Sequence, residues 1–206
     1  DKSAAVRMAV LLVQRRWSDP HIAQFLDDAE LQIVTEAARA INDLPLTTVR
    51  DKLANLAQRY KNASGDNTVP LMRRIINANL QLGSRTNVEA VIGIATSVKQ
   101  SIVVRKEAIS ALSVWQRYTK RDRVTGFWQP IAARDQSTVR DAVQNSASKL
   151  LATASADLLV DVTKLLTRLD VKTDDQAFAA WVADSNRSTD VRIAALRLLE
   201  SRKYDK

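Results

Sequence analysis

The sequence predicts an all-α protein, an α-α superhelix built from antiparallel helical hairpins. Apolar residues recur at helical spacing along most of the chain, as in Leu31, Val34, Ala38 and Ile41. Glycine and proline are scarce, with four of each among 206 residues, whereas an all-β fold needs many turns. Aromatic residues are only 5% of the chain, which favours helices that pack closely through alanine and leucine.

This periodicity divides the chain into about eleven helices joined by short connections, so that neighbours are expected to run antiparallel. The expected spans are 3–16, 20–27, 30–43, 47–60, 69–82, 87–99, 103–118, 137–152, 156–169, 174–183 and 190–202. No cluster of linker residues interrupts them for long, so residues 1–206 are interpreted as one domain. The first residues carry no initiator methionine or signal-peptide pattern, and the chain is expected to be a piece of a longer protein.

Local signals mark several helix ends. Asp19 precedes Pro20 as a cap followed by proline at the first helical position. Thr86 and Glu89 have the spacing of a capping box, in which each side chain satisfies the other residue's free N–H. Gly83 follows an apolar run and is interpreted as a helix stop.

A short motif recurs near the starts of five predicted helices, with valine followed by alanine three or four residues later. The valines are Val6, Val34, Val104, Val139 and Val191. Positions 34, 104 and 139 are separated by 70 and 35 residues, and a period near 35 is typical of HEAT and related helical arrays. Four of the motifs carry an arginine after the valine, at Arg7, Arg105, Arg140 and Arg192. We expect these arginines to bond across neighbouring repeats, and the alternative is a basic ladder for a ligand.

Two segments resemble a particular kind of HEAT protein. One contains DPHIA at 19–23 and EAARAINDLP at 36–45; the other contains RKEA at 105–108, Trp115 and RDRVTGFWQP at 121–130. Both resemble the HEAT region of large bacterial proteins that join a sorbosone- or glucose-dehydrogenase-like β-propeller, HEAT repeats and a c-type cytochrome. The resemblance implies a spacer between redox modules and export to the periplasm. The chain itself has no Cys-x-x-Cys-His and no propeller signature, so the haem and quinone chemistry of such proteins is not expected here.

Composition limits the chemistry further. With no cysteine, the chain contains no disulfide, no thiolate nucleophile and no Cys-ligated metal. No apolar run reaches the length of a membrane span. The single histidine, His21, lies near Asp27 and Asp28, but a surface or capping role is favoured over a metal site. Neither a nucleophile elbow nor a phosphate loop is present, so the sequence predicts no enzyme, no cofactor and no metal.

The net charge is +8 and the pI is about 10.0, which is compatible with an acidic protein partner or with nucleic acid. The first functional hypothesis is a scaffold that binds a protein or a neighbouring domain. The second is a nucleic-acid-binding protein resembling the HEAT-like alkyl-purine DNA glycosylases, for which Asp122 near Trp128 is the one loose candidate for a catalytic pair. Charges dispersed over solvated helix faces would serve neither purpose.

Segment 119–136 is the longest stretch without helical periodicity, and it is the first candidate interaction site. Its apolar residues are surrounded by charges, as at many protein interfaces. The residues expected to bind a partner are Arg121, Arg123, Phe127, Trp128 and Arg134. Two interpretations stay open, because the segment either docks a partner or plugs a gap between repeats. The other tryptophans, Trp17, Trp115 and Trp181, are expected in the core.

Overall fold

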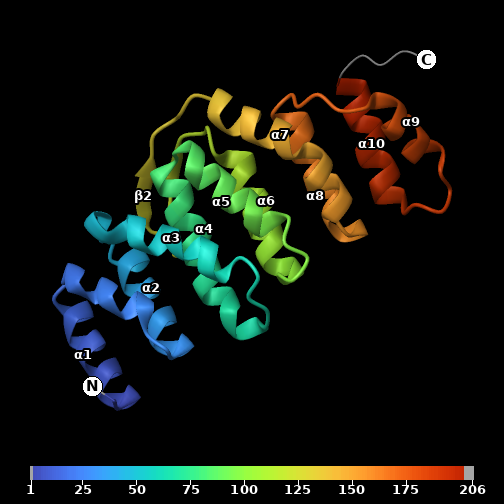
Figure 1. The fold of residues 1–206 in the computed structure, drawn as a ribbon. Coiled ribbons are helices and arrows are strands. Elements are labelled where there is room, and N and C mark those ends of the chain that lie inside the picture. The colour runs from blue at the N-terminus through green and yellow to red at the C-terminus, as the bar shows by residue number, and fades with distance from the viewer. Residues whose placement is uncertain (1, 202–206) are drawn as a thin grey trace.

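The computed structural model describes residues 2–201, and helices dominate it (Figure 1). The α-helices are α1 (Ala4–Arg16), α2 (Leu31–Asp43), α3 (Arg50–Tyr60), α4 (Val69–Leu82), α5 (Arg85–Ala95), α6 (Ile102–Val114), α7 (Ser137–Thr153), α8 (Ala156–Arg168), α9 (Asp175–Ala183) and α10 (Thr189–Ser201). Three 3₁₀ helices precede or join them, namely η1 (Pro20–Asp27), η2 (Thr47–Val49) and η3 (Asp66–Thr68). The strands β1 (Thr119–Arg121) and β2 (Trp128–Ile131) form a two-stranded antiparallel sheet. The predicted all-α class is therefore confirmed apart from this small hairpin.

Several helix ends carry the predicted signals. The side chain of Asp19 accepts a hydrogen bond from the backbone N–H of His21 at 2.9 Å, and Pro20 begins η1, which is a 3₁₀ helix. Gly83 ends α4 in the left-handed conformation, with φ 76°. The predicted capping box at Thr86 is wrong, because α5 begins earlier and Ser84 forms the box instead with Asn87. The last predicted helix reaches residue 202, which lies outside the described residues.

The helices pack as two rows. In one row α1 contacts α2, and the row continues through α4, α6, α8 and α10. In the other row η1 contacts α3, which contacts α5, which contacts α7. Across the two rows η1 pairs with α2, α3 with α4 and α5 with α6, and α9 packs against α10 at the C-terminal end. In Figure 1 these pairs follow one another from the N-terminal end to the C-terminal end.

Apolar side chains fill the space between the rows. The core runs from Leu11 in α1 to Leu199 in α10 without a break into separate clusters. Trp115, just after α6, is among its largest buried side chains. Polar contacts also join successive pairs: Asn77 Nδ2 donates to Asn42 Oδ1 at 2.8 Å, and Ser97 Oγ bonds to Asn62 Oδ1 at 2.9 Å. Both contacts join residues 35 positions apart, which is the period that the sequence predicts.

Candidate interaction site

The segment between α6 and α7 forms a β-hairpin, although the sequence shows no sustained strand pattern there. Thr119 pairs with Ile131 and Arg121 pairs with Trp128 across the two strands. The turn closes through hydrogen bonds within 122–127, and Gly126 supplies its positive φ of 74°. Strands of three and four residues are too short to show alternation, which is why the sequence predicts only a non-helical segment.

Asp122 is the anchor of this hairpin, since only 3% of its surface is exposed. Its Oδ1 accepts from the backbone N–H of Val124 at 2.9 Å and of Thr125 at 2.8 Å, which fixes the turn. Its Oδ2 accepts from Asn77 Nδ2 at 2.5 Å and from Gln81 Nε2 at 3.0 Å, both on α4. One buried carboxylate therefore shapes the turn and ties it to a core helix.

A half-buried cation lies near this carboxylate. Burial lowers the pKa of Arg50, at the start of α3, and the negative charge of Asp122 opposes that effect. Turning the amide of Gln129 lets its nitrogen donate to Asp122 Oδ2 at 2.9 Å while its oxygen accepts from Arg50 at 3.0 Å. The inner side of β2 thus joins the network, and the hairpin is held to α3 as well as to α4.

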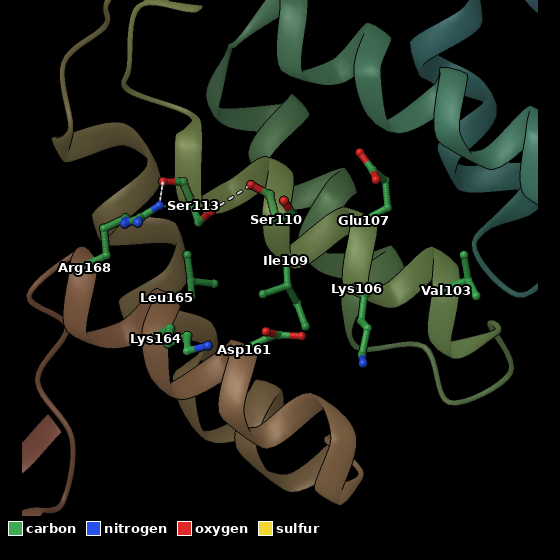
Figure 2. A pocket seen from close by; sticks show the side chains of 10 residues that line it. All are labelled: Val103, Lys106, Glu107, Ile109, Ser110, Ser113, Asp161, Lys164, Leu165 and Arg168. Atoms are coloured by element: carbon green, nitrogen blue, oxygen red, sulfur yellow. Dashed lines mark hydrogen bonds between the residues drawn. The ribbon is translucent and has the colours of Figure 1, made fainter. Parts of the chain in front are cut away.

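Two arginines that the sequence assigns to partner binding also hold the hairpin in place. Arg123 Nη2 donates to Glu107 Oε1 at 2.9 Å and to Ser110 Oγ at 2.8 Å, two residues of α6 that are labelled in Figure 2. Arg134 donates to the backbone oxygens of Leu80 at 2.5 Å and Gln81 at 2.6 Å, which are free carbonyls at the end of α4. Their guanidinium groups are thus engaged inside the molecule, which leaves three of the five predicted residues on the surface.

Those three residues lie on the outer side of the hairpin. Phe127 is 66% exposed and Trp128 is 65% exposed. Arg121, the cross-strand neighbour of Trp128, is exposed and donates to the carbonyl of Gly126 at 2.9 Å. Ile131 faces the opposite way and is buried, so the plug interpretation applies to the inner side of the hairpin and not to Trp128.

The repeated arginines differ according to their row. Arg105 Nε donates to the carbonyl of Ala95 at 2.8 Å, and Arg192 Nε donates to the carbonyl of Val182 at 2.9 Å. In both cases the acceptor is ten residues back, at the end of the preceding helix, so these bonds lie within a helical pair. Arg105 also donates through Nη2 to the carbonyl of Thr153 on α7 at 2.8 Å, which reaches the next pair, whereas the bond of Arg192 to Val182 does not cross repeats as expected. Arg7 forms an ion pair with Asp28 at 2.7 Å, and these three arginines lie in the row that contains α2 and α4.

Arg140 makes no such bond to another helix of the described chain. It lies on α7, in the row of α3 and α5, and its Nε donates only to the adjacent Asp141 at 3.4 Å among the bonds described. The spacing of 35 between Val104 and Val139 therefore joins two helices with different positions in the fold. The expected role of Arg140 is corrected for this reason.

The other residues named from the sequence, His21 and the tryptophans Trp17 and Trp181, lie outside the hairpin. His21 is exposed and bonds to Asp19 at 2.8 Å, and residues 2–201 contain no group of three or more potential metal ligands. Within the same residues, no helix is both long and apolar enough to cross a membrane. Trp181 is half-buried and packs on Phe178, with ring centroids 4.7 Å apart. Trp17 was expected in the core, but it follows the last turn of α1 and is 73% exposed.

The buried network around Asp122 is the feature that sequence reasoning missed. Asn42, Asn77 and Gln81 were not singled out, although Asn42 and Asn77 both follow an isoleucine and are separated by one repeat. A polar residue repeated at the array's own period, on the apolar side of two helices, is the signal that would have found them.

Comparison of the chain with protein-family models, with curated proteins and with solved structures returns no match.

Proposed function

We propose that this chain is a HEAT-type solenoid that acts as a scaffold and docks a partner protein or a neighbouring domain through its hairpin. The two rows of helices and the contacts one repeat apart support a repeating architecture. In such arrays each pair of helices contacts its neighbours, and the extended faces are free to bind other molecules. The proposal includes no catalytic step.

The observation that carries the proposal is the contrast between the two sides of the hairpin. The inner side is secured by a buried carboxylate, a half-buried arginine and side-chain amides, all of which are costly to desolvate. The outer side presents Phe127 and Trp128 to solvent. Large aromatic side chains held on a rigid support are typical centres of protein interfaces. A hairpin that served only to fill a gap would not require both aromatics on the outside.

The family resemblance supports a particular setting for the scaffold. In the proteins that the chain resembles, the HEAT region separates a β-propeller from a cytochrome domain. The partner would then be a neighbouring domain of the same polypeptide, located in the periplasm. The hairpin belongs to the segment that carries the resemblance, RDRVTGFWQP at 121–130.

The alternative, binding of nucleic acid, is supported by the net charge of +8. Its candidate catalytic residue, Asp122, is buried and accepts hydrogen bonds at both of its oxygens. We expect affinity for duplex DNA that is weaker than about micromolar near physiological salt and that falls steeply as salt is added. Tight binding to a defined sequence or lesion would reverse the order of the two functions.

Capture experiments with matched variants test the docking proposal. The wild-type chain, the double variant Phe127→Ala/Trp128→Ala and the control Val98→Ala are immobilised and exposed to an extract of cells that express the gene. Val98 is a suitable control because it is 71% exposed and lies between α5 and α6. We expect one protein to bind wild type and control and to be lost with the double variant, while the melting temperatures of all three stay similar.

Two results would count against docking at the hairpin. One is retention of every captured protein by the double variant. The other is a large fall in its melting temperature, which would show that the aromatics support the fold.

A further inference from the structure

A groove runs between α6 and α8, two neighbouring helices of one row (Figure 2). Its volume is about 500 Å³, which lies within the range of clefts that hold ligands. The lining residues on α6 extend from Val103 to Ser113, which is roughly 15 Å along the helix at a rise of 1.5 Å per residue. α4 also packs against α6, and α10 also packs against α8. The groove is therefore open although both of its walls have further neighbours.

The groove combines an apolar floor with positively charged rims. Ile109 is 2% exposed and Leu165 is 1% exposed, and the two side chains lie between the helices in Figure 2. Lys106 on α6 and Lys164 on α8 are exposed, and so is Arg168 at one end of the groove. A ligand that fits must therefore carry both apolar groups and negative charge.

The positive charge of the groove is not neutralised by the chain itself. Glu107 lines the groove, but its carboxylate is paired with Arg123 of the hairpin at 2.9 Å. Three cations and one other carboxylate, Asp161, remain among the lining residues, an excess of two positive charges. Within residues 2–201, no carboxylate lies within ion-pair distance of Lys106 or Lys164.

The same row of helices is neutralised nearer the N-terminus. Arg39 on α2 pairs with Glu36 at 3.3 Å, and Arg74 on α4 pairs with Asp43 at 2.9 Å. These arginines use their charges within the fold, whereas the lysines of the groove are available to a partner.

Two features of the groove favour a protein segment over nucleic acid. None of the residues that line it is aromatic, so bases would find no surface on which to stack. Asp161 would repel a phosphate backbone, which carries a negative charge at every nucleotide, but it can accept a hydrogen bond from the N–H of a peptide.

The length of the groove fits an extended chain. Such a chain rises about 3.3 Å per residue, so about five residues span the groove. Successive side chains point to opposite sides of an extended chain. Apolar side chains can therefore reach the floor while acidic ones in between stay near the lysines at the rims.

We propose that the α6–α8 groove binds an extended segment of a partner protein in which acidic and apolar residues alternate. The site does not rest on docking by Phe127 and Trp128. Arg123 connects the two regions, since it belongs to the hairpin and masks the negative charge of Glu107 in the groove.

A fluorescein-labelled peptide of about nine residues, in which glutamate and leucine alternate, is the probe, and it is long enough to extend beyond both ends of the groove. We expect saturable binding by fluorescence anisotropy near physiological salt, and at least about tenfold weaker binding when glutamine replaces glutamate. The groove pair Lys106→Glu/Lys164→Glu should also weaken binding at least about tenfold. The control pair Lys52→Glu/Lys149→Glu makes the same change in net charge at exposed positions of α3 and α7 and should bind normally. Circular dichroism checks that each variant keeps its helices.

A second set of variants tests the contribution of Arg123. Arg123→Met leaves the charge of Glu107 unmasked and should weaken binding of the glutamate peptide. Arg123→Met/Glu107→Gln removes both charges and should restore the affinity, although the contact between the hairpin and α6 stays broken. Phe127→Ala/Trp128→Ala should bind the peptide normally, so that failure at the hairpin and failure at the groove are distinguishable.

Four outcomes would overturn the proposal. The wild-type chain could show no saturable binding of the glutamate peptide, or bind the glutamine peptide equally well. The control pair could weaken binding as much as the groove pair, which would reduce the effect to net charge. Arg123→Met/Glu107→Gln could bind as weakly as Arg123→Met. Oligothymidylate could bind more tightly than the peptide and be lost with the groove pair, which would identify nucleic acid as the occupant.

Discussion

Replacing Asp122 with alanine tests whether a buried carboxylate holds the hairpin. The change removes the acceptor for two backbone N–H groups of the turn and for the amides of Asn77 and Gln81. It also leaves the half-buried Arg50 without its nearby negative charge. Removing one member of a buried charged network costs about 3–5 kcal/mol, and hydrogen bonds to a charged group contribute about 1.5–3 kcal/mol each without being additive. We expect the free energy of unfolding to fall by about 3 kcal/mol.

Urea unfolding followed by circular dichroism measures this loss, and hydrogen exchange shows where it arises. Amides of 119–131 should exchange much faster in Asp122→Ala, whereas those of α9 and α10 should change little. Asp122→Asn keeps an acceptor for the turn but sets a donor against the donors of Asn77 and Gln81, so it should cost less, about 1–2 kcal/mol. Asp141→Ala, at an exposed site, is the control. A loss for Asp122→Ala below about 0.5 kcal/mol, the range of ordinary surface changes, would refute the reasoning.

Three further variants examine other parts of the fold. Arg105→Met should lower the free energy of unfolding by about 2 kcal/mol in urea titrations, because it leaves buried carbonyls unpaired. The control Arg140→Met, at the exposed arginine of α7, should lower it by less than about 0.5 kcal/mol. Gly83→Ala should lower the melting temperature, since φ at this position is 76° and the new methyl group would lie 2.2 Å from the Arg134 guanidinium. Gly93→Ala, in α5 with open space around it, should raise the melting temperature, because it adds about 0.5–1 kcal/mol to the free energy of unfolding. Arg7 holds the pKa of Asp28 below its ordinary value, so the stability from this pair is present above the unfolded-state pKa of about 3.9 and is lost as pH falls through the lowered folded-state pKa. Arg7→Met should therefore be less stable than wild type at neutral pH, and the two should converge in strong acid. Equal stability at neutral pH, or equal effects of the paired glycine or arginine changes, would contradict these expectations.

The helices were predictable because their evidence is local. Apolar spacing and capping residues specify where a helix begins and ends within a few positions, as at Asp19, Pro20 and Gly83. The same evidence could not distinguish a 3₁₀ helix from an α-helix at 20–27, since apolar residues three and four positions apart in so short a segment fit either. It also could not assign helices to rows, which is why Arg140 was grouped with Arg7, Arg105 and Arg192.

Only the position of the candidate site along the chain could be predicted, and the roles of its charged residues could not. The absence of helical spacing located segment 119–136, but the role of each charged residue depends on helices far away in the sequence. Arg134 bonds to carbonyls more than fifty residues away, and Asp122 bonds to side chains more than forty residues away. Such contacts have no local pattern. The exposure of Trp17 escaped prediction for the same reason, because helical phase alone does not say whether a neighbour covers a given side.

Site-specific photo-crosslinking from the hairpin tests the central claim most directly. A photoreactive phenylalanine analogue replaces Trp128 in cells that express the gene, and the same analogue replaces Val98 in the control. Both positions are exposed, and neither replacement disturbs the core. The account predicts a crosslink from position 128 to one defined protein or to a defined domain of the same polypeptide, with no such product from position 98. Crosslinks to nucleic acid, or the same products from both positions, would contradict it.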